Sequence, residues 1–267
     1  MKCLLNGQIL DSAAANILVT DRGFTLGDGL FETIRVRAGR MQRLPAHIAR
    51  LTRGAHLLGI PMPDQDVLEA LEMVRTANAL DDGVLRLTLT RGSGPRGVLP
   101  PANPEPTLLI TPAPMAPLPP PARLIIATVT RRNEMSPLAG VKSLNYLDNI
   151  LARQEAATRQ TDDALLLNTQ GRIAETSIAN IFALIEGRLL TPPLQDGALP
   201  GVMRAAMLGQ GAQEHPLAPE DLAGAEELFL TSSLGIRPVR ELENSTFTSF
   251  TIAERLSQRV GETLNVG

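Results

Sequence analysis

Several residue types are scarce in this chain of 267 residues, and each scarcity excludes a class of protein. The single cysteine, Cys3, leaves no internal disulfide and no cysteine-rich metal site. The three histidines are scattered without the spacing of a zinc motif, so we expect no metal site. With no tryptophan and one tyrosine, Tyr146, neither a base-stacking surface nor an aromatic cage is expected.

Charge and hydropathy exclude two further classes of partner. The net charge of −3 provides no basic field for a nucleic acid or an acidic membrane surface. The chain lacks the apolar run of about 18 residues that a membrane span needs, and the N-terminal MKCLLNGQIL turns polar too soon for a leader. We therefore expect a cytoplasmic globular enzyme that binds neither nucleic acid nor membrane.

A proline-rich segment divides the chain. Residues 111–122, TPAPMAPLPPPA, contain six prolines, which disfavour both a helix interior and a central strand. We expect an N-terminal domain at 1–113, an extended linker at 114–121 and a C-terminal domain at 122–267. Both domains mix helix and strand patterns, so the expected fold class is α+β.

Hydrophobic periodicity and turn signals predict the individual elements. In the N-terminal domain, two hairpins turn at 6–7 and 38–39, strands cover 83–91 and 106–111, and helices cover 45–59 and 65–80. In the C-terminal domain, strands are expected at 122–130, 163–168, 177–185, 187–191 and 227–233, and helices at 145–160, 200–208 and 250–264. Ile34 and Val36 alternate with polar neighbours and should face a core.

The stretch RGSGPRGVLPP, residues 91–101, contains the letters G-x-G-x-x-G of a dinucleotide-binding turn. A strand precedes these glycines, but the prolines that follow them prevent the helix whose N-terminus would face a pyrophosphate. The stretch is therefore either an exposed hairpin connection or an anion-binding loop, in which Arg91 or Arg96 grips a carboxylate.

Lys142 is the first candidate for chemistry. It lies at the start of the helix expected at 145–160, where a positive charge is electrostatically unfavourable. A surface lysine is the ordinary alternative, but a lysine at such a position can also act as a Schiff-base nucleophile.

Six segments together resemble the class IV, or fold-type IV, pyridoxal-phosphate enzymes. That family contains branched-chain aminotransferases, D-amino-acid aminotransferases and aminodeoxychorismate lyases. The segments follow the family's order across residues 2–245 and read TDRGFTLGDGLFETIRV, LPAHIARL, GVKSLNYLDNILARQEA, ETSIANIF, PGVMRAAML and LTSSLGIRPV. The resemblance implies pyridoxal 5′-phosphate as cofactor, a small-molecule amino substrate, a homodimer, and an active site in the cleft between two domains.

The resemblance also implies roles for single residues around the cofactor ring. Lys142, in the C-terminal domain, matches the lysine that forms the Schiff base and moves the proton during reaction. Glu175 matches the carboxylate that hydrogen-bonds the pyridine nitrogen, and its alternative is an ordinary carboxylate at a strand end. Tyr146 matches a tyrosine near the phenolic oxygen of the cofactor, and its alternative is a core aromatic.

A second group of residues is implied for the cofactor phosphate. Arg50 matches the arginine that clamps the phosphate, although its place on the helix also allows a solvated side chain. The backbone N–H groups of Val202 and Met203 match a phosphate site at a helix start. Ser232 and Ser233 are both candidates for the hydroxyl that completes this site, because the sequence leaves their register open.

The choice within the family depends on a third group. The RGSGPRG loop resembles the RGxGxRG loop of the lyases, and Gly235 stands where aminotransferases usually have glutamate. The histidine of the usual D-amino-acid carboxylate site is missing after Arg96, where Gly97 and Val98 follow. These features favour aminodeoxychorismate lyase.

The segment KSLNYLDNILARQEA is closer to the aminotransferases, so a D-amino-acid or branched-chain aminotransferase remains the alternative. In either case Arg96, and with it Arg91, would grip a substrate carboxylate. Phe31 is the candidate for the wall of the substrate pocket.

Overall fold

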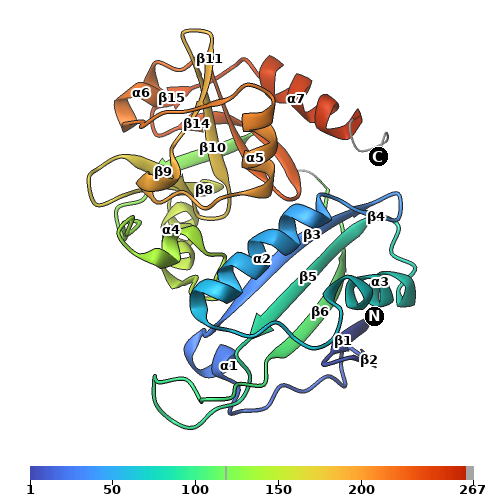
Figure 1. The fold of residues 1–267 in the computed structure, drawn as a ribbon. Helices are drawn as coiled ribbons and strands as arrows, with labels where there is room; N and C mark the ends of the chain where they lie inside the picture. The colour runs from blue at the N-terminus through green and yellow to red at the C-terminus, as the bar shows by residue number, and fades with distance from the viewer. Residues whose placement is uncertain (118, 263–267) are drawn as a thin grey trace. The chain divides into compact units, whose positions relative to one another are not determined.

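The computed structural model describes residues 1–117 and 119–262 (Figure 1). The chain forms two compact units, each with its own sheet. The first unit contains Met1–Ala116 together with Val141–Asn145, and the second contains Pro117–Gly140 and the chain from Tyr146 onward.

The first unit is built on an antiparallel sheet in the order β2-β1-β6-β5-β3-β4. Its elements are β1 (Lys2–Leu5), β2 (Gln8–Asp11), α1 (Arg22–Leu26), β3 (Gly29–Arg37), β4 (Arg40–Met41), α2 (Leu44–Leu58), α3 (Val67–Ala77), β5 (Gly83–Thr90) and β6 (Thr107–Pro114).

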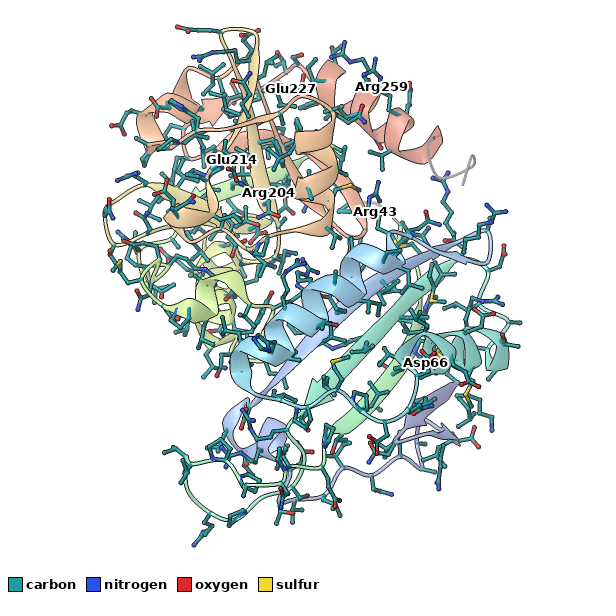
Figure 2. The ribbon with its side chains drawn as sticks, in the orientation of Figure 1. Arg43, Asp66, Arg204, Glu214, Glu227 and Arg259 are labelled. Atoms are coloured by element: carbon teal, nitrogen blue, oxygen red, sulfur yellow. The ribbon has the colours of Figure 1, made fainter. Side chains whose placement is uncertain are left out.

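Helices α2 and α3 supply the apolar side chains that cover this sheet. Leu51 and Ala55 of α2 are buried in one core with Ile34 and Val36 of β3, which confirms the expected inward face of that strand. The side chain of Asp66 accepts hydrogen bonds from the N–H groups of the first turn of α3 and so caps that helix (Figure 2).

The prolines at the end of β6 behave differently from the sequence-based expectation. Pro112 and Pro114 lie in strand β6 and pair with Leu85 and Gly83 of β5, so a strand does extend into the proline-rich segment. The neighbour on the other side, β1, pairs with β6 only at Leu109 and Ile110. The proline nitrogens, which have no hydrogen to donate, therefore lie beyond the stretch that pairs on both sides.

The second unit contains a mixed sheet in the order β12-β11-β10-β13-β14-β7-β8-β9, with β15 paired to β14. Its elements are β7 (Ala122–Ile126), the 3-10 helix η1 (Pro137–Gly140), α4 (Leu147–Thr158), β8 (Asp163–Leu167), β9 (Ile173–Thr176), β10 (Asn180–Ile185), β11 (Arg188–Thr191), the 3-10 helix η2 (Leu194–Asp196), α5 (Val202–Gly209), β12 (Gln213–Glu214), α6 (Pro219–Ala223), β13 (Glu227–Ser232), β14 (Gly235–Leu242), β15 (Ser245–Thr246) and α7 (Thr251–Glu262).

Apolar side chains on both faces of this sheet are buried, and α5 and α7 share one of these cores. Phe182 and Phe229 stack at its centre with their ring centroids 5.2 Å apart. The fully buried carboxylate of Glu227 accepts hydrogen bonds from the backbone N–H groups of Ile252 and Ala253, and so holds the first turn of α7 (Figure 2). The last two residues of the helix expected at 250–264 lie outside the described residues.

The segment Val141–Asn145 follows the proline-rich stretch in sequence, but its contacts place it in the first unit. The N–H of Phe31 donates to the carbonyl oxygen of Lys142 over 3.0 Å, and the N–H of Leu144 donates to Gly29 over 2.9 Å. The expectation placed Lys142 in the C-terminal domain. The difference arises because this short segment pairs with the start of β3, which periodicity cannot reveal.

None of the described helices is long and apolar enough to cross a membrane.

Candidate active site

Lys142 lies over an aromatic ring of the first unit. Its Nζ atom is 4.4 Å from the centroid of Phe31, whose side chain is nearly buried. The guanidinium carbon of Arg86 lies 4.0 Å from the same centroid. Phe31 is therefore a shared surface for two cationic groups, one of which is the candidate nucleophile.

Arg86 was missed by the sequence-based reasoning, because its place depends on the register between β5 and β3. It alternates with buried Leu85 and Leu87 on β5, and its register partner on β3 is Thr33, two residues from Phe31. Because side chains two residues apart share a face of a strand, Arg86 lies on the same face as Phe31.

Arg50 is buried, so the solvated alternative for this residue is wrong. Its Nε and Nη2 atoms donate to the two carboxylate oxygens of Glu32 over 2.7 and 2.6 Å. The Nδ1 atom of His47 lies 2.7 Å from the same carboxylate. This bidentate pair fixes the plane of the Arg50 guanidinium.

The Glu32 carboxyl is held in its ionised form. Burial raises its pKa, but the hydrogen bonds and charges of Arg50 and His47 outweigh burial, and the pKa lies below its ordinary value of 4.5.

Glu175 lies in the second unit, on the short strand β9, with its carboxylate nearly buried. Its Oε2 atom accepts hydrogen bonds from the Leu199 N–H over 3.0 Å and from the Asn180 amide over 3.3 Å. Its Oε1 atom lies 2.9 Å from Nη2 of Arg132. The carboxylate is thus oriented from both sides.

Arg132 is a second residue that the sequence-based reasoning missed. Besides Glu175, its guanidinium donates to the carbonyl oxygens of Gly197 and Ala139 over 3.0 and 3.2 Å. No local pattern marks this arginine, because two of its partners, Glu175 and Gly197, lie far from it in sequence.

The start of α5 carries the backbone N–H groups of Val202 and Met203, whose side chains are buried. A Cβ atom on Gly201, which precedes them, would lie 2.1 Å from Oδ1 of Asn180. Only glycine therefore permits this close approach. Arg204 fixes the first turn of α5, because its Nη2 atom donates to the Pro192 carbonyl over 2.8 Å and to Glu214 (Figure 2).

The two candidate serines lie at the end of strand β13. Ser232 ends the strand, and its hydroxyl accepts a hydrogen bond from the Leu234 N–H over 3.2 Å. Ser233 is half-buried in the turn that leads to Gly235. The hydroxyl of Thr231, just before them, is buried and has no hydrogen-bond partner among the described residues. Tyr146 is half-buried and directly precedes α4, so it is not a core aromatic of that helix.

The two arginines of the 91–101 stretch have different surroundings. Arg96 is exposed. Arg91 is buried, and its guanidinium donates to Asp28 and to the carbonyl oxygens of Leu58 and Gly59 over 2.7–3.1 Å. The placement of Arg91 differs from the expected substrate grip, because its donors already serve the protein's own backbone and Asp28.

Taken by itself, each of the two units carries groups of the kind that a phosphorylated pyridine cofactor requires. Lys142 offers an amine, Glu175 an oriented carboxylate, and α5 a helix start whose N–H groups favour an anion. The hydroxyl of buried Thr231 has no hydrogen-bond partner among the described residues, and a bound phosphate would supply one. No cluster of His, Cys, Asp and Glu able to hold a metal ion occurs among residues 1–117 and 119–262.

Comparison with known proteins identifies the family of this chain. A sequence profile described as "Amino-transferase class IV" matches residues 29–242. A putative branched-chain-amino-acid aminotransferase of Methanocaldococcus jannaschii is 35% identical, over 95% of this chain and 92% of that protein. A D-alanine aminotransferase of Bacillus licheniformis is 27% identical, over 93% and 91%.

Among solved structures, the 4-amino-4-deoxychorismate lyase of Pseudomonas aeruginosa is similar with a TM-score of 0.84 and 33% identity, over 98% of this chain and 99% of that one. The activities named for these relatives differ, so the comparisons establish the family rather than one reaction. The chain belongs to the class IV aminotransferase family, whose members are fold-type IV aminotransferases and lyases that depend on pyridoxal phosphate.

Proposed function

We propose that this enzyme is a 4-amino-4-deoxychorismate lyase, which releases p-aminobenzoate and pyruvate. The observation that carries the proposal is the loop RGSGPRG, which presents Arg96 to solvent while Arg91 is held inside. Gly235 supports it, because this residue follows the serine pair with a φ of 138° where aminotransferases usually carry a glutamate.

The proposed reaction needs no second substrate. One proton leaves the ring carbon that bears the amino group, the bond between the ring and the enolpyruvyl oxygen breaks, and the ring becomes aromatic. The atoms of the substrate are all found in p-aminobenzoate and pyruvate. Aromatisation supplies the driving force, so the enzyme must bind, orient and move one proton.

Lys142 would carry out the proton transfer at its Nζ atom. Bound pyridoxal phosphate supplies an electron sink for the carbon that loses its proton. Glu175, oriented by Arg132 and Asn180, would bind the pyridine nitrogen, and Tyr146 would lie near the phenolic oxygen. The residues proposed to hold the cofactor phosphate are Arg50, the N–H groups of Val202 and Met203, and the hydroxyls of Ser232 and Ser233.

The substrate carries two carboxylates, and the first unit offers cationic groups for them. Arg96 is proposed to bind one of them, with Phe31 forming an apolar wall. Arg86 is a further candidate, because it lies over the same ring as Lys142. Arg91 is assigned to the support of the loop.

The second candidate function is a class IV aminotransferase of the D-amino-acid or branched-chain type. The segment KSLNYLDNILARQEA favours it, and so does the 35% identity to the putative archaeal branched-chain enzyme. This reaction would require an amino donor and a 2-oxo acid acceptor.

The test begins with the cofactor. Lys142 and Lys2 are the lysines of the sequence, so borohydride reduction followed by peptide mapping has two possible targets. We expect the pyridoxyl group on Lys142. Lys142→Ala should abolish the visible absorption, while Lys2→Ala should keep it, because Lys2 pairs with exposed Asp11 in a strand hairpin. A colourless wild-type protein that binds no pyridoxal phosphate would overturn the proposed function.

The second step separates the two activities. The enzyme should form p-aminobenzoate and pyruvate from 4-amino-4-deoxychorismate with no 2-oxo acid added. Strict dependence on an amino donor and a 2-oxo acid, with no p-aminobenzoate formed, would transfer the assignment to the aminotransferase.

We also propose a cytoplasmic homodimer. In the first unit, the exposed apolar side chains of Leu18, Val19, Phe24, Val98 and Leu99 are of the kind that a partner subunit covers. Sedimentation equilibrium should give twice the mass of 28.6 kDa, and cell fractionation should recover the enzyme in the cytosol. A monomer at micromolar concentration would contradict the dimer.

A further inference from the structure

Arg22, in the short helix α1, is a buried arginine that binds the backbone of the 92–101 loop. Its Nη1 atom donates to the carbonyl oxygen of Gly97 over 3.0 Å and, more weakly, to that of Leu99 over 3.5 Å. Its Nη2 atom donates to Val98 over 2.8 Å. One guanidinium thus serves three consecutive carbonyl groups next to Arg96.

The loop has few other connections. Residues 95–100 are exposed, and within the described chain the hydrogen bonds to the backbone of 95–101 come from Arg22. The loop's first residues are tied by the N–H of Arg22, which donates to Gly92, and by the N–H of Gly94, which donates to Thr20. The conformation around Arg96 therefore depends on a single side chain.

Asp28 fixes the direction of that side chain. Its Oδ2 atom accepts hydrogen bonds from Nε of Arg22 and from Nε of Arg91, both over 2.8 Å. Burial raises the pKa of the Asp28 carboxyl, but the hydrogen bonds from Arg91 and Arg22 outweigh it, and the pKa lies below its ordinary value. The Asp28 carboxylate thus connects Arg91, which directly follows β5, to Arg22, which binds the loop.

The glycines of the loop suit this arrangement. Gly92 has a φ of 83°, and a Cβ atom there would lie 1.7 Å from the carbonyl oxygen of Glu105. A Cβ atom on Gly94 would lie 2.9 Å from Cδ of Arg22. The first two glycines of G-x-G-x-x-G therefore let the chain turn closely past Arg22, a role unrelated to a nucleotide.

We propose that Arg22, held by Asp28, is a positioning residue for substrate recognition, because it sets the conformation of the loop that carries Arg96. The substrate part of this inference rests on the proposed function, in which Arg96 binds a substrate carboxylate. Lysine cannot replace Arg22, since one ammonium group cannot reach Asp28 and the loop carbonyls together in the planar geometry of a guanidinium.

The first experiment measures the loop without turnover. Trypsin cleaves after arginine, and Arg96 is exposed in the loop, so the fragment that begins at Gly97 reports how often this loop leaves its bound conformation. Arg22→Lys should release that fragment about tenfold faster than the wild type, since charge-assisted hydrogen bonds to the loop are lost. Arg53→Lys, on the exposed face of α2, is the control and should leave the cleavage rate unchanged.

The second experiment measures recognition. In the Arg22→Lys holoenzyme, the KM for 4-amino-4-deoxychorismate should rise roughly fivefold or more, while kcat should change less than about twofold. The visible absorption of the cofactor should stay unchanged. Equal cleavage and equal KM in Arg22→Lys and wild type would overturn the inference. Faster cleavage with an unchanged KM would overturn its substrate part.

Gly94→Ala tests the same contact from the loop side, should Arg22→Lys fold poorly. The added Cβ atom meets the Arg22 side chain, and we expect faster release of the Gly97 fragment and a raised KM. Gly224→Ala is the matched control, because the nearest atom to its Cβ would lie at an ordinary 3.9 Å. A wild type that lacks lyase activity but shows this loop behaviour would refute the proposed function and leave the assignment of Arg22 to the loop standing.

Discussion

The Nζ atom of Lys142 lies 4.4 Å from the centre of the Phe31 ring, and the backbone N–H of Phe31 donates to the carbonyl oxygen of Lys142 over 3.0 Å. Phe31 therefore contacts Lys142 at two points, through its backbone N–H and through its ring. The guanidinium of Arg86 also lies over the Phe31 ring, so replacement of Phe31 should disturb two cationic groups together.

Phe31→Leu keeps an apolar side chain but removes the π face. We expect kcat/KM to fall roughly fivefold, since a cation–π contact contributes about 0.5–2 kcal/mol to the position of each cationic group. The free energy of unfolding should change by about 1 kcal/mol. Phe31→Tyr retains the ring and is the control, so equal kcat/KM in the two variants would show that the ring has no positioning role.

The pair of Glu32 and Arg50 leads to a prediction about stability. Glu32→Gln removes the negative charge that Arg50 and His47 share, and leaves a buried guanidinium without its counter-ion. We expect a loss of about 2–4 kcal/mol in the free energy of unfolding at pH 7. Pyridoxal phosphate should also bind more weakly, because the plane of Arg50 is no longer fixed.

The pH dependence of this effect has a definite sign. The pKa of Glu32 in the folded protein lies below its ordinary value of 4.5, so its stabilising contribution is complete above 4.5 and is lost as the pH falls through the lower folded value. The difference in unfolding free energy between wild type and Glu32→Gln should thus be constant above about pH 6 and shrink below pH 4.5. Urea denaturation across this range measures it, and a difference that grows toward acid pH would contradict the assignment.

Much of the fold could be predicted from local pattern. The stripe that includes Leu51 and Ala55 predicts α2, and the alternation around Ile34 and Val36 predicts the buried face of β3, because each depends only on periodicity. Strand β14 was missed, since its sequence GIRPVREL carries a proline and three charged residues. Its pairing with β13 and β7 depends on partners that a single sequence does not identify.

The candidate site residues also divide into those that a sequence pattern marks and those that depend on distant partners. Lys142 and Glu175 could be named as candidates because family motifs mark them. Arg86, Arg132 and Arg22 could not, because each acts through a carbonyl, a ring or a carboxylate brought close by the register of distant strands and loops. Lys142 and its neighbours pair with the start of β3, which is far from them in sequence. The place of Lys142 in the first unit could therefore not be predicted.

Gly201 leads to a prediction about the cofactor phosphate. Gly201→Ala places a Cβ atom 2.1 Å from Oδ1 of Asn180, so either Asn180 or the start of α5 must move. We expect the dissociation constant of pyridoxal phosphate to rise about tenfold or more and the unfolding free energy to fall by about 1–3 kcal/mol. Fluorescence titration of the apoenzyme measures the first and urea denaturation the second.

Gly209→Ala, at the other end of the same helix, is the matched control. Its Cβ atom would meet no atom within 4 Å, so this variant should bind the cofactor normally and be as stable as the wild type or slightly more so. Equal cofactor affinity in Gly201→Ala and Gly209→Ala would exclude the start of α5 as a phosphate site.

Arg132 leads to the last prediction, which concerns catalysis more than binding. Arg132→Lys keeps a positive charge near Glu175, but a lysine cannot also donate to Gly197 and Ala139 in the planar arrangement of the guanidinium. Glu175 would still accept hydrogen bonds from Leu199 and Asn180, so the cofactor should bind. We expect kcat to fall roughly tenfold with little change in cofactor affinity, because in the proposed function the electron sink would depend on the angle between the Glu175 carboxylate and the pyridine nitrogen. Stopped-flow spectra should show slower proton removal. If Arg132→Lys instead binds pyridoxal phosphate more weakly but has an unchanged kcat when saturated with the cofactor, then Arg132 contributes to cofactor binding and not to catalysis.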